Sequence, residues 1–78
     1  MAVTDLVTYL TRSLVDEPES VEIREVAGER GAVIEVSVAP DDVGKVIGRR
    51  GRIVQAIRTL AKAAAAGEGR RVQVEIIE

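Results

Sequence analysis

The chain has no cysteine and no histidine, and Tyr9 is its only aromatic residue. Disulfide bonds and the usual Cys/His zinc sites are therefore excluded as stabilising elements. Catalysis by a cysteine nucleophile or a histidine base is excluded for the same reason. Without Phe or Trp the core must be aliphatic, and the bases of a nucleic acid would find no aromatic platform for stacking.

Long apolar runs are also missing from the 78 residues, although 46% of them are hydrophobic. No segment approaches the roughly 18 apolar residues that span a membrane, and the N-terminus lacks the pattern of a signal peptide. We therefore expect a cytoplasmic protein with no membrane partner. The length predicts a single domain over residues 1–78, close to the lower size limit for independent stability.

The net charge of −2 conceals a strong asymmetry along the chain. Eight basic residues and one acidic residue lie between Val43 and Arg71, whereas the remainder carries three basic and twelve acidic residues. Such a separation indicates one basic face suited to a polyanion and an acidic face directed elsewhere.

Hydrophobic periodicity predicts an α+β domain with the element order α-β-β-α-α-β. The pattern favours a helix over residues 3–15 capped near Thr4, a β-hairpin over 21–39 with a bulge near Val26, and a last strand over 71–77. Two helices joined by a glycine-containing loop are expected over residues 41–66, the second burying Ile53, Ile57 and Leu60. Three helices on one face of a three-stranded sheet are the simplest packing of these elements.

The spacing Gly-x-x-Gly occurs twice, at Gly28–Gly31 and at Gly48–Gly51. A motif this short is weak by itself, and its context decides its meaning. The first copy lies between two predicted strands and is typical of a hairpin turn. The second, with Arg49 and Arg50 between its glycines, joins two predicted helices, so a phosphate could approach a bare backbone at a helix N-terminus.

The segment D-D-V-G-K-V-I-G-R-R-G-R-I-V-Q-A-I resembles the signature of KH domains, in which V-I-G-x-x-G-x-x-I joins two helices. Val54 takes the final apolar position of that signature. The element order resembles the type II KH fold, and the resemblance covers the whole chain. It is nearest to the small bacterial single-domain KH proteins of the KhpA (YlqC-like) family.

The resemblance implies a non-catalytic protein that clamps about four nucleotides of single-stranded RNA. Gly48 and Gly51 would let the sugar-phosphate backbone pack against the loop, while Arg49 and Arg50 would contact phosphates. The other implied site residues are Arg52 and Lys45, which border the loop, and an apolar floor of Val43, Gly44 and Ile47 with some of Ile34, Val36 and Val38. We expect modest affinity, weak sequence preference and a clear dependence on salt.

Other interpretations of these residues are weaker. Asp41 and Asp42 could form a metal or acid/base pair, but adjacent acids at a helix start are more often a cap and a dipole partner. Gly44-Lys45 lacks the remainder of a nucleotide-binding P-loop. A helix-hairpin-helix DNA motif would have a different glycine spacing and no flanking strands. No metal and no cofactor are expected.

Two functions from different classes remain open. The first is an RNA-binding module, which would suit a post-transcriptional regulator or an RNA chaperone. The second is a protein–protein adaptor that forms a dimer and leaves most RNA contacts to its partner. The resemblance implies self-pairing or pairing with a larger Jag-like KH protein, so the two functions are compatible.

Overall fold

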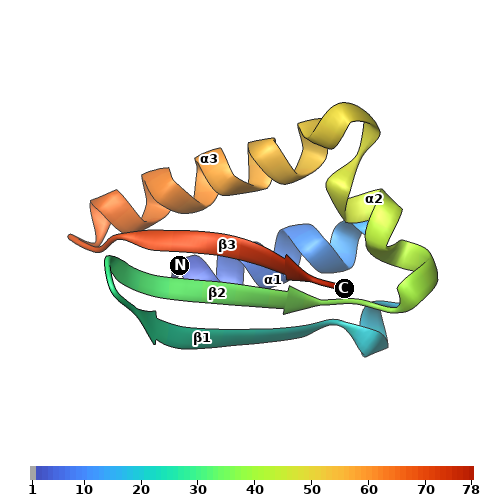
Figure 1. Ribbon diagram of the computed structural model, residues 1–78, viewed down its shortest axis with the longest axis horizontal. Helices are drawn as coiled ribbons and strands as arrows, with labels where there is room; N and C mark the ends of the chain where they lie inside the picture. The colour runs from blue at the N-terminus through green and yellow to red at the C-terminus, as the bar shows by residue number, and fades with distance from the viewer. Residues whose placement is uncertain (1) are drawn as a thin grey trace.

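The computed structural model describes residues 2–78, which form a small sheet with helices packed against it (Figure 1). In chain order the helices and strands are α1 (Val3–Leu14), β1 (Glu22–Gly28), β2 (Gly31–Ser37), α2 (Val43–Ile47), α3 (Arg52–Gly67) and β3 (Val72–Ile77). Short 3-10 turns cover Pro18–Ser20, Pro40–Asp42 and Arg49–Gly51. The predicted α+β class and the order α-β-β-α-α-β are confirmed.

The sheet has the strand order β1-β2-β3, with β1 antiparallel to β2 and β2 parallel to β3. The first pair runs without interruption from Glu22 opposite Ser37 to Gly28 opposite Gly31, so the predicted bulge near Val26 is wrong. The apolar–polar alternation of β1 is interrupted in the sequence because Glu25 lies on the helix-covered face, where an apolar residue is expected. Its carboxylate makes an ion pair with Arg70, 2.7 Å away.

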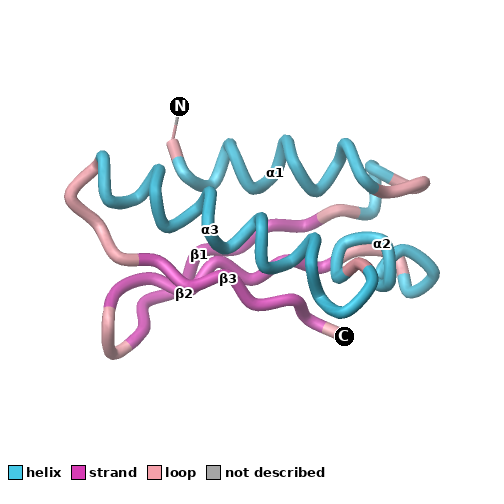
Figure 2. Tube along the Cα trace, turned by 90° about the horizontal axis from the view of Figure 1, so that it is seen from above, coloured by secondary structure: helices cyan, strands magenta, loops and turns pink. Residues whose placement is uncertain are grey.

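Two helices cover one face of the sheet. Figures 1 and 2 show α1 and α3 side by side on that face, while α2 lies at the end of the sheet near the C-terminus of β3. The core between the layers is aliphatic, as the absence of Phe and Trp requires. Its buried members are Val3, Val7, Ile34, Val36, Ile57, Ala61, Ala65, Val72 and Val74.

Helix α3 turns its predicted apolar stripe only partly toward the core. Of its expected core residues only Ile57 is buried, and Leu60 is 48% exposed, so its assignment to the core is wrong. Ile53 is half-buried. Val54, Ala61 and Ala65 occupy the remaining inward positions. Small alanines there allow the helix to lie close to the sheet, and the larger apolar side chains turn toward α1.

Helix α1 buries Val3, Val7 and Thr11. Its N-cap is Ala2, with no side-chain hydrogen bond, so the side-chain cap expected from Thr4 or a neighbour is not formed. Thr11 is 1% exposed, and its hydroxyl has no hydrogen-bond partner among the described residues. None of the helices within residues 2–78 has the length and apolar character needed to cross a membrane.

Candidate nucleic-acid interface

The second Gly-x-x-Gly segment forms the connection between α2 and α3. Helix α2 ends at Ile47, and Gly48 closes it by donating its N–H to the carbonyl oxygen of Gly44 at 2.9 Å. A single 3-10 turn follows, in which the N–H of Gly51 reaches the carbonyl oxygen of Gly48 at 3.1 Å. Helix α3 then begins at Arg52. The loop is therefore one compact, hydrogen-bonded turn.

The backbone conformation favours glycine at both ends of this loop. Gly48 has φ 78° and ψ 171°, a combination essentially restricted to glycine. Gly51 has φ 73° and lies in the left-handed region. Arg50 between them is the only non-glycine residue of the described chain with a positive φ, 58°. Such a conformation costs on the order of 1 kcal/mol, and residues that adopt it are enriched at ligand clamps and other functional sites.

The two loop arginines are free to meet a ligand. Arg49 and Arg50 are exposed, and neither takes part in the ion pairs formed within residues 2–78. Directly after them, α3 starts without a side-chain cap and has no acidic residue in its first turn. Uncapped N–H groups and the positive end of the helix dipole therefore lie beside two unpaired guanidinium groups.

The apolar residues predicted to flank the loop fall into two groups. Val43 and Ile47 are half-buried and Gly44 is exposed, so this side of α2 is a surface that a ligand can reach. Ile34 and Val36 are 0% and 1% exposed, respectively. They lie on the central strand and face the helices, so their assignment to a ligand-contacting floor is wrong. Val38 is half-buried and packs against the same core.

Lys45 is engaged by two acidic residues. Its Nζ lies 3.1 Å from Oδ2 of Asp16 and 3.4 Å from Oδ1 of Asp42. The hydrogen bond to Asp16 is the main cause that raises the pKa of Lys45. Lys45 therefore differs from the loop arginines, because its ammonium group has ion-pair partners and their guanidinium groups have none among the described residues.

Asp42 is the buried carboxylate of this region, with 1% exposure. The sequence predicted that it would cap its own helix, but its side chain makes no such hydrogen bond. It accepts hydrogen bonds instead from the N–H groups of Asp16 and Glu17, at 3.2 and 3.1 Å. Burial by itself raises the pKa of Asp42, but these donors and Lys45 outweigh burial and lower it. Asp42 therefore ties the segment after α1 to the start of α2. Asp41 is exposed.

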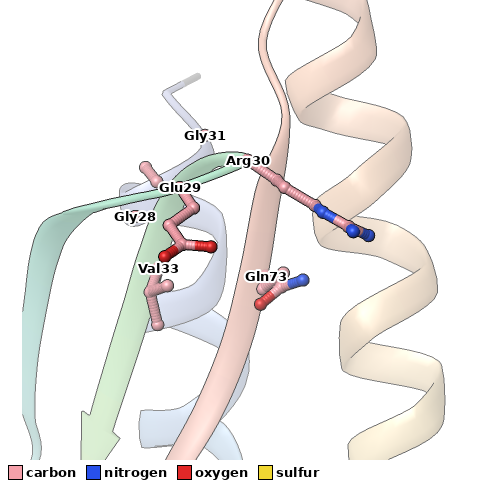
Figure 3. A pocket seen from close by; sticks show the side chains of 7 residues that line it. Gly28, Glu29, Arg30, Gly31, Val33 and Gln73 are labelled. Atoms are coloured by element: carbon pink, nitrogen blue, oxygen red, sulfur yellow. The ribbon is translucent and has the colours of Figure 1, made fainter.

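The first Gly-x-x-Gly segment is the tip of the β1–β2 hairpin, as predicted (Figure 3). Gly31 has φ 119°, and a Cβ there would collide with the carbonyl oxygen of Arg71, the residue before β3. Its glycines thus serve strand packing, unlike those of the α2–α3 loop.

An apolar groove between α1 and α3 was missed by the sequence reasoning. It encloses about 310 Å³ and is lined by Leu10, Ser13, Leu14, Arg52, Ile53, Ala56, Ile57 and Leu60. The sequence feature that could have predicted this groove is the width of the apolar stripe on α3, which is wider than packing against the sheet alone can bury. Tyr9 is 63% exposed on the neighbouring surface of α1.

The arrangement of the elements is that of a KH domain. Among solved structures, Aquifex aeolicus Era bound to GDP and aluminium fluoride matches with a TM-score of 0.64 and 22% identity. The match covers 95% of this chain but 29% of the Era chain. Era in complex with MgGDPNP and nucleotides 1506–1542 of 16S ribosomal RNA matches with the same TM-score over 28% of that chain. These likenesses concern the fold alone.

The family model described as "KhpA/KhpB, KH domain" matches residues 4–76. Proteins named "RNA-binding protein KhpA" are similar over nearly their whole length. The one from Caldanaerobacter subterraneus subsp. tengcongensis is 56% identical, covering 94% of this chain and 97% of that protein. The one from Borreliella burgdorferi is 47% identical over 95% and 90%. The chain belongs to the KhpA/KhpB family of KH domains. These relatives are named as RNA-binding proteins rather than enzymes, which confirms the prediction of a non-catalytic protein.

Proposed function

We propose that this chain is a non-catalytic RNA-binding protein that holds about four nucleotides of single-stranded RNA against the Gly48–Gly51 loop. The observation that carries the proposal is the pair of exposed, unpaired arginines in a glycine-bounded turn at an uncapped helix N-terminus. The relatives named as RNA-binding proteins support the same function.

Each part of the site has a distinct task. The glycines remove side chains from the path of the sugar-phosphate backbone, so the strand approaches the turn closely. Arg49 and Arg50 donate charge-assisted hydrogen bonds to phosphates, and Arg52 adds positive charge at the start of α3. Val43, Gly44 and Ile47 form the apolar side of the site, against which a ribose or base packs. Lys45 contributes little, because Asp16 and Asp42 hold its charge.

Recognition of this kind is mainly electrostatic. With no aromatic platform in the site, bases gain little stacking energy and sequence preference is weak. A protein with these properties suits a post-transcriptional regulator or an RNA chaperone, which must visit many RNAs. The test is a salt titration of labelled single-stranded RNA. The logarithm of the association constant should fall with the logarithm of the salt concentration, with a slope of about −0.7 per neutralised phosphate. A flat response would contradict the phosphate clamp.

The apolar groove between α1 and α3 supports a second, compatible function, the formation of a dimer. Leu60 is 48% exposed, and Leu10, Leu14 and Ile53 beside it are only partly buried. Such a groove on a domain with a small core gains stability when a second apolar face covers it. A second copy of this chain or a larger Jag-like KH protein would supply that face. In the adaptor form of this function, the partner also supplies most RNA contacts.

Sedimentation analysis tests the dimer. The wild type should form dimers at micromolar concentrations, and Leu60→Glu should shift it to monomers while circular dichroism shows an unchanged fold. Gln55→Glu, at an exposed position on the other side of the same helix, is the matched control and should remain dimeric. A wild type that stays monomeric would contradict self-pairing, and RNA binding by that monomer would contradict the adaptor.

A further inference from the structure

Helix α2 carries the apolar side of the proposed RNA site, yet it is too short to hold its own position. It has five residues, Val43–Ile47, and its N-cap makes no side-chain hydrogen bond. An isolated helix of this length is unstable in water, so contacts with other elements must fix its direction. Its buried residue is Val46, with 0% exposure. One buried side chain fixes the place of α2 but only weakly its rotation about its own axis.

A group of charged side chains supplies a further constraint on α2, and we call this group the clasp. It consists of Asp16, Asp42 and Lys45. Asp42 directly precedes α2, is 1% exposed and accepts hydrogen bonds from the N–H groups of Asp16 and Glu17 at 3.2 and 3.1 Å. Lys45 follows one turn later, and its Nζ lies 3.4 Å from Oδ1 of Asp42 and 3.1 Å from Oδ2 of Asp16. The clasp therefore holds α2 at two positions on one side, three residues apart.

The segment after α1 is the fixed partner in these contacts. Helix α1 is anchored in the core by Val3 and Val7, both 0% exposed. Figures 1 and 2 show the end of α1 and helix α2 at the same end of the domain. Because Asp16 and Glu17 follow α1 closely, their bonds to Asp42 tie the position of α2 to that of the long helix.

The orientation of α2 determines the geometry of the RNA site. Its exposed side presents Gly44, and the carbonyl oxygen of Gly44 accepts the N–H of Gly48, the first loop residue, at 2.9 Å. A rotation of α2 would shift this apolar side relative to Arg49 and Arg50 and would disturb the hydrogen bond that closes the helix. A site whose parts must be brought into place during binding has a lower affinity than a preorganised one.

We propose that Asp16, Asp42 and Lys45 are positioning residues of the RNA site, which hold α2 against the segment after α1 without contacting RNA themselves. This inference rests on the proposed RNA-binding function. It gives Lys45 an indirect role, because its charge is used within the fold although it lies beside the loop in the sequence. Electrostatic attraction alone predicts a different behaviour, since removing an acid near the site would then favour RNA.

Asp16→Asn tests the proposal, because two roles of Lys45 predict opposite results for it. If Lys45 were a phosphate ligand restrained by Asp16, the variant would release it, RNA affinity would rise and the salt slope would steepen by about 0.7. As a positioning residue, Lys45 loses its partner, and the variant should bind RNA about threefold more weakly with an unchanged slope. A factor of this size corresponds to the loss of one exposed ion pair.

The binding measurement is a fluorescence-anisotropy titration of labelled single-stranded RNA at several salt concentrations, after circular dichroism has shown that each variant is folded. Glu17→Gln is the matched control for Asp16→Asn. It removes the same charge from the neighbouring exposed position, and its side chain takes part in none of the ion pairs formed within residues 2–78. The substitution keeps the N–H group that Asp42 accepts. Glu17→Gln should therefore bind RNA at least as tightly as the wild type.

Three further variants separate positioning from direct contact. Lys45→Met should bind about fivefold more weakly with an unchanged salt slope, whereas loss of a phosphate ligand would make the slope shallower by about 0.7. Asp16→Asn/Lys45→Met should bind no more weakly than Lys45→Met alone, because the side chain of Asp16 acts through Lys45. Asp42→Asn should have the largest effect, about tenfold, since it weakens the buried centre of the clasp.

Tighter binding by Asp16→Asn, or a shallower salt slope for Lys45→Met, would overturn the proposal and make Lys45 a phosphate ligand. Wild-type affinity in folded Lys45→Met and Asp42→Asn would also overturn it, because the clasp would then serve stability alone. Failure of the proposed function has a different signature. In that case the wild type would not bind single-stranded RNA, or Arg49→Asp/Arg50→Asp would bind it unchanged, and the positioning role would fall with the site.

Discussion

Gly48 and Ile53 are in direct contact across the α2–α3 turn, and the contact leaves no room for a side chain on Gly48. A Cβ built there would lie 2.6 Å from Cγ1 of Ile53. Ile53 also lines the apolar groove toward α1. The shape of the proposed RNA-binding loop is therefore set by packing against the first turn of α3, and the two proposed surfaces meet at one residue.

Gly48→Ala should destabilise the protein and weaken RNA binding, because it adds both a collision and an unfavourable φ of 78°. We expect a loss of about 1–3 kcal/mol in the free energy of unfolding, measured by urea denaturation. Gly67→Ala is the matched control, since no atom lies within 4 Å of a Cβ there and its φ is not positive. Equal stability of Gly48→Ala and wild type would show that the turn adapts freely.

Substitution of Gly44 by alanine should have the opposite effect on stability. Gly44 lies on the exposed side of α2, and no atom lies within 4 Å of a Cβ added there. Gly44→Ala should raise the free energy of unfolding by about 0.5–1 kcal/mol, since alanine is the better helix former. Gly44→Phe should fold equally well but lower RNA affinity by filling the path of the strand. Circular dichroism and anisotropy measure the two effects separately. Unchanged RNA affinity in Gly44→Phe would remove Gly44 from the proposed site.

Thr11→Val should stabilise the protein by about 1 kcal/mol. The substitution keeps the side-chain shape and removes a buried hydroxyl that has no hydrogen-bond partner among the described residues. Thr59→Val on α3 serves as the control, because its hydroxyl is exposed and bonded to the carbonyl oxygen of Gln55. Thermal or urea unfolding measures both. A destabilised Thr11→Val would show that the hydroxyl has a partner in solution, such as a buried water.

The free energy of unfolding should fall in acid because of Asp42. Its pKa in the folded protein lies below the usual 3.8, so the unfolded chain binds this proton more readily than the folded one. The stabilisation by Asp42 is therefore full above pH 3.8 and is lost as the pH falls through the lowered value. Asp42→Asn should be less stable than wild type at pH 7, and the difference should shrink in acid. Asp41→Asn, at the exposed neighbouring position, is the control for the substitution and should match the wild type at pH 7. A stability difference for Asp42→Asn that does not change with pH would contradict the linkage.

The order of the elements could be predicted because each one carries its own periodicity. The alternation of Val72 and Val74 and the helical spacing of Val3 and Val7 follow from one buried face each, and both pairs lie in the core. The positions of the two Gly-x-x-Gly loops could also be predicted, because each depends only on the elements that flank it in the sequence. Prediction failed where two faces of one element are both apolar, as on α3. There the sequence could not tell that Ala61 faces the sheet while Leu60 faces α1 and solvent.

The remaining errors involve contacts between residues distant in sequence. Nothing near Glu25 reveals that Arg70 holds it on the covered face of β1. Asp42 resembles a helix cap in the sequence, yet its hydrogen bonds go to a segment 25 and 26 residues earlier. Arg49, Arg50 and Lys45 were grouped by their nearness in the chain, and only the fold distinguishes the paired lysine from the unpaired arginines.

The most direct test of the central claim compares RNA binding by the wild type, Arg49→Asp/Arg50→Asp and Arg12→Asp/Arg24→Asp. The two double variants change the net charge equally, but only the first alters the Gly48–Gly51 loop. Labelled single-stranded RNA is titrated by fluorescence anisotropy at two salt concentrations, after circular dichroism has confirmed the fold of each protein. The loop variant should bind at least about tenfold more weakly, with a salt slope shallower by about 1.4 for two lost phosphates, while Arg12→Asp/Arg24→Asp stays near the wild type. Equal affinities and slopes for the two double variants would contradict the assignment of the RNA site to this loop.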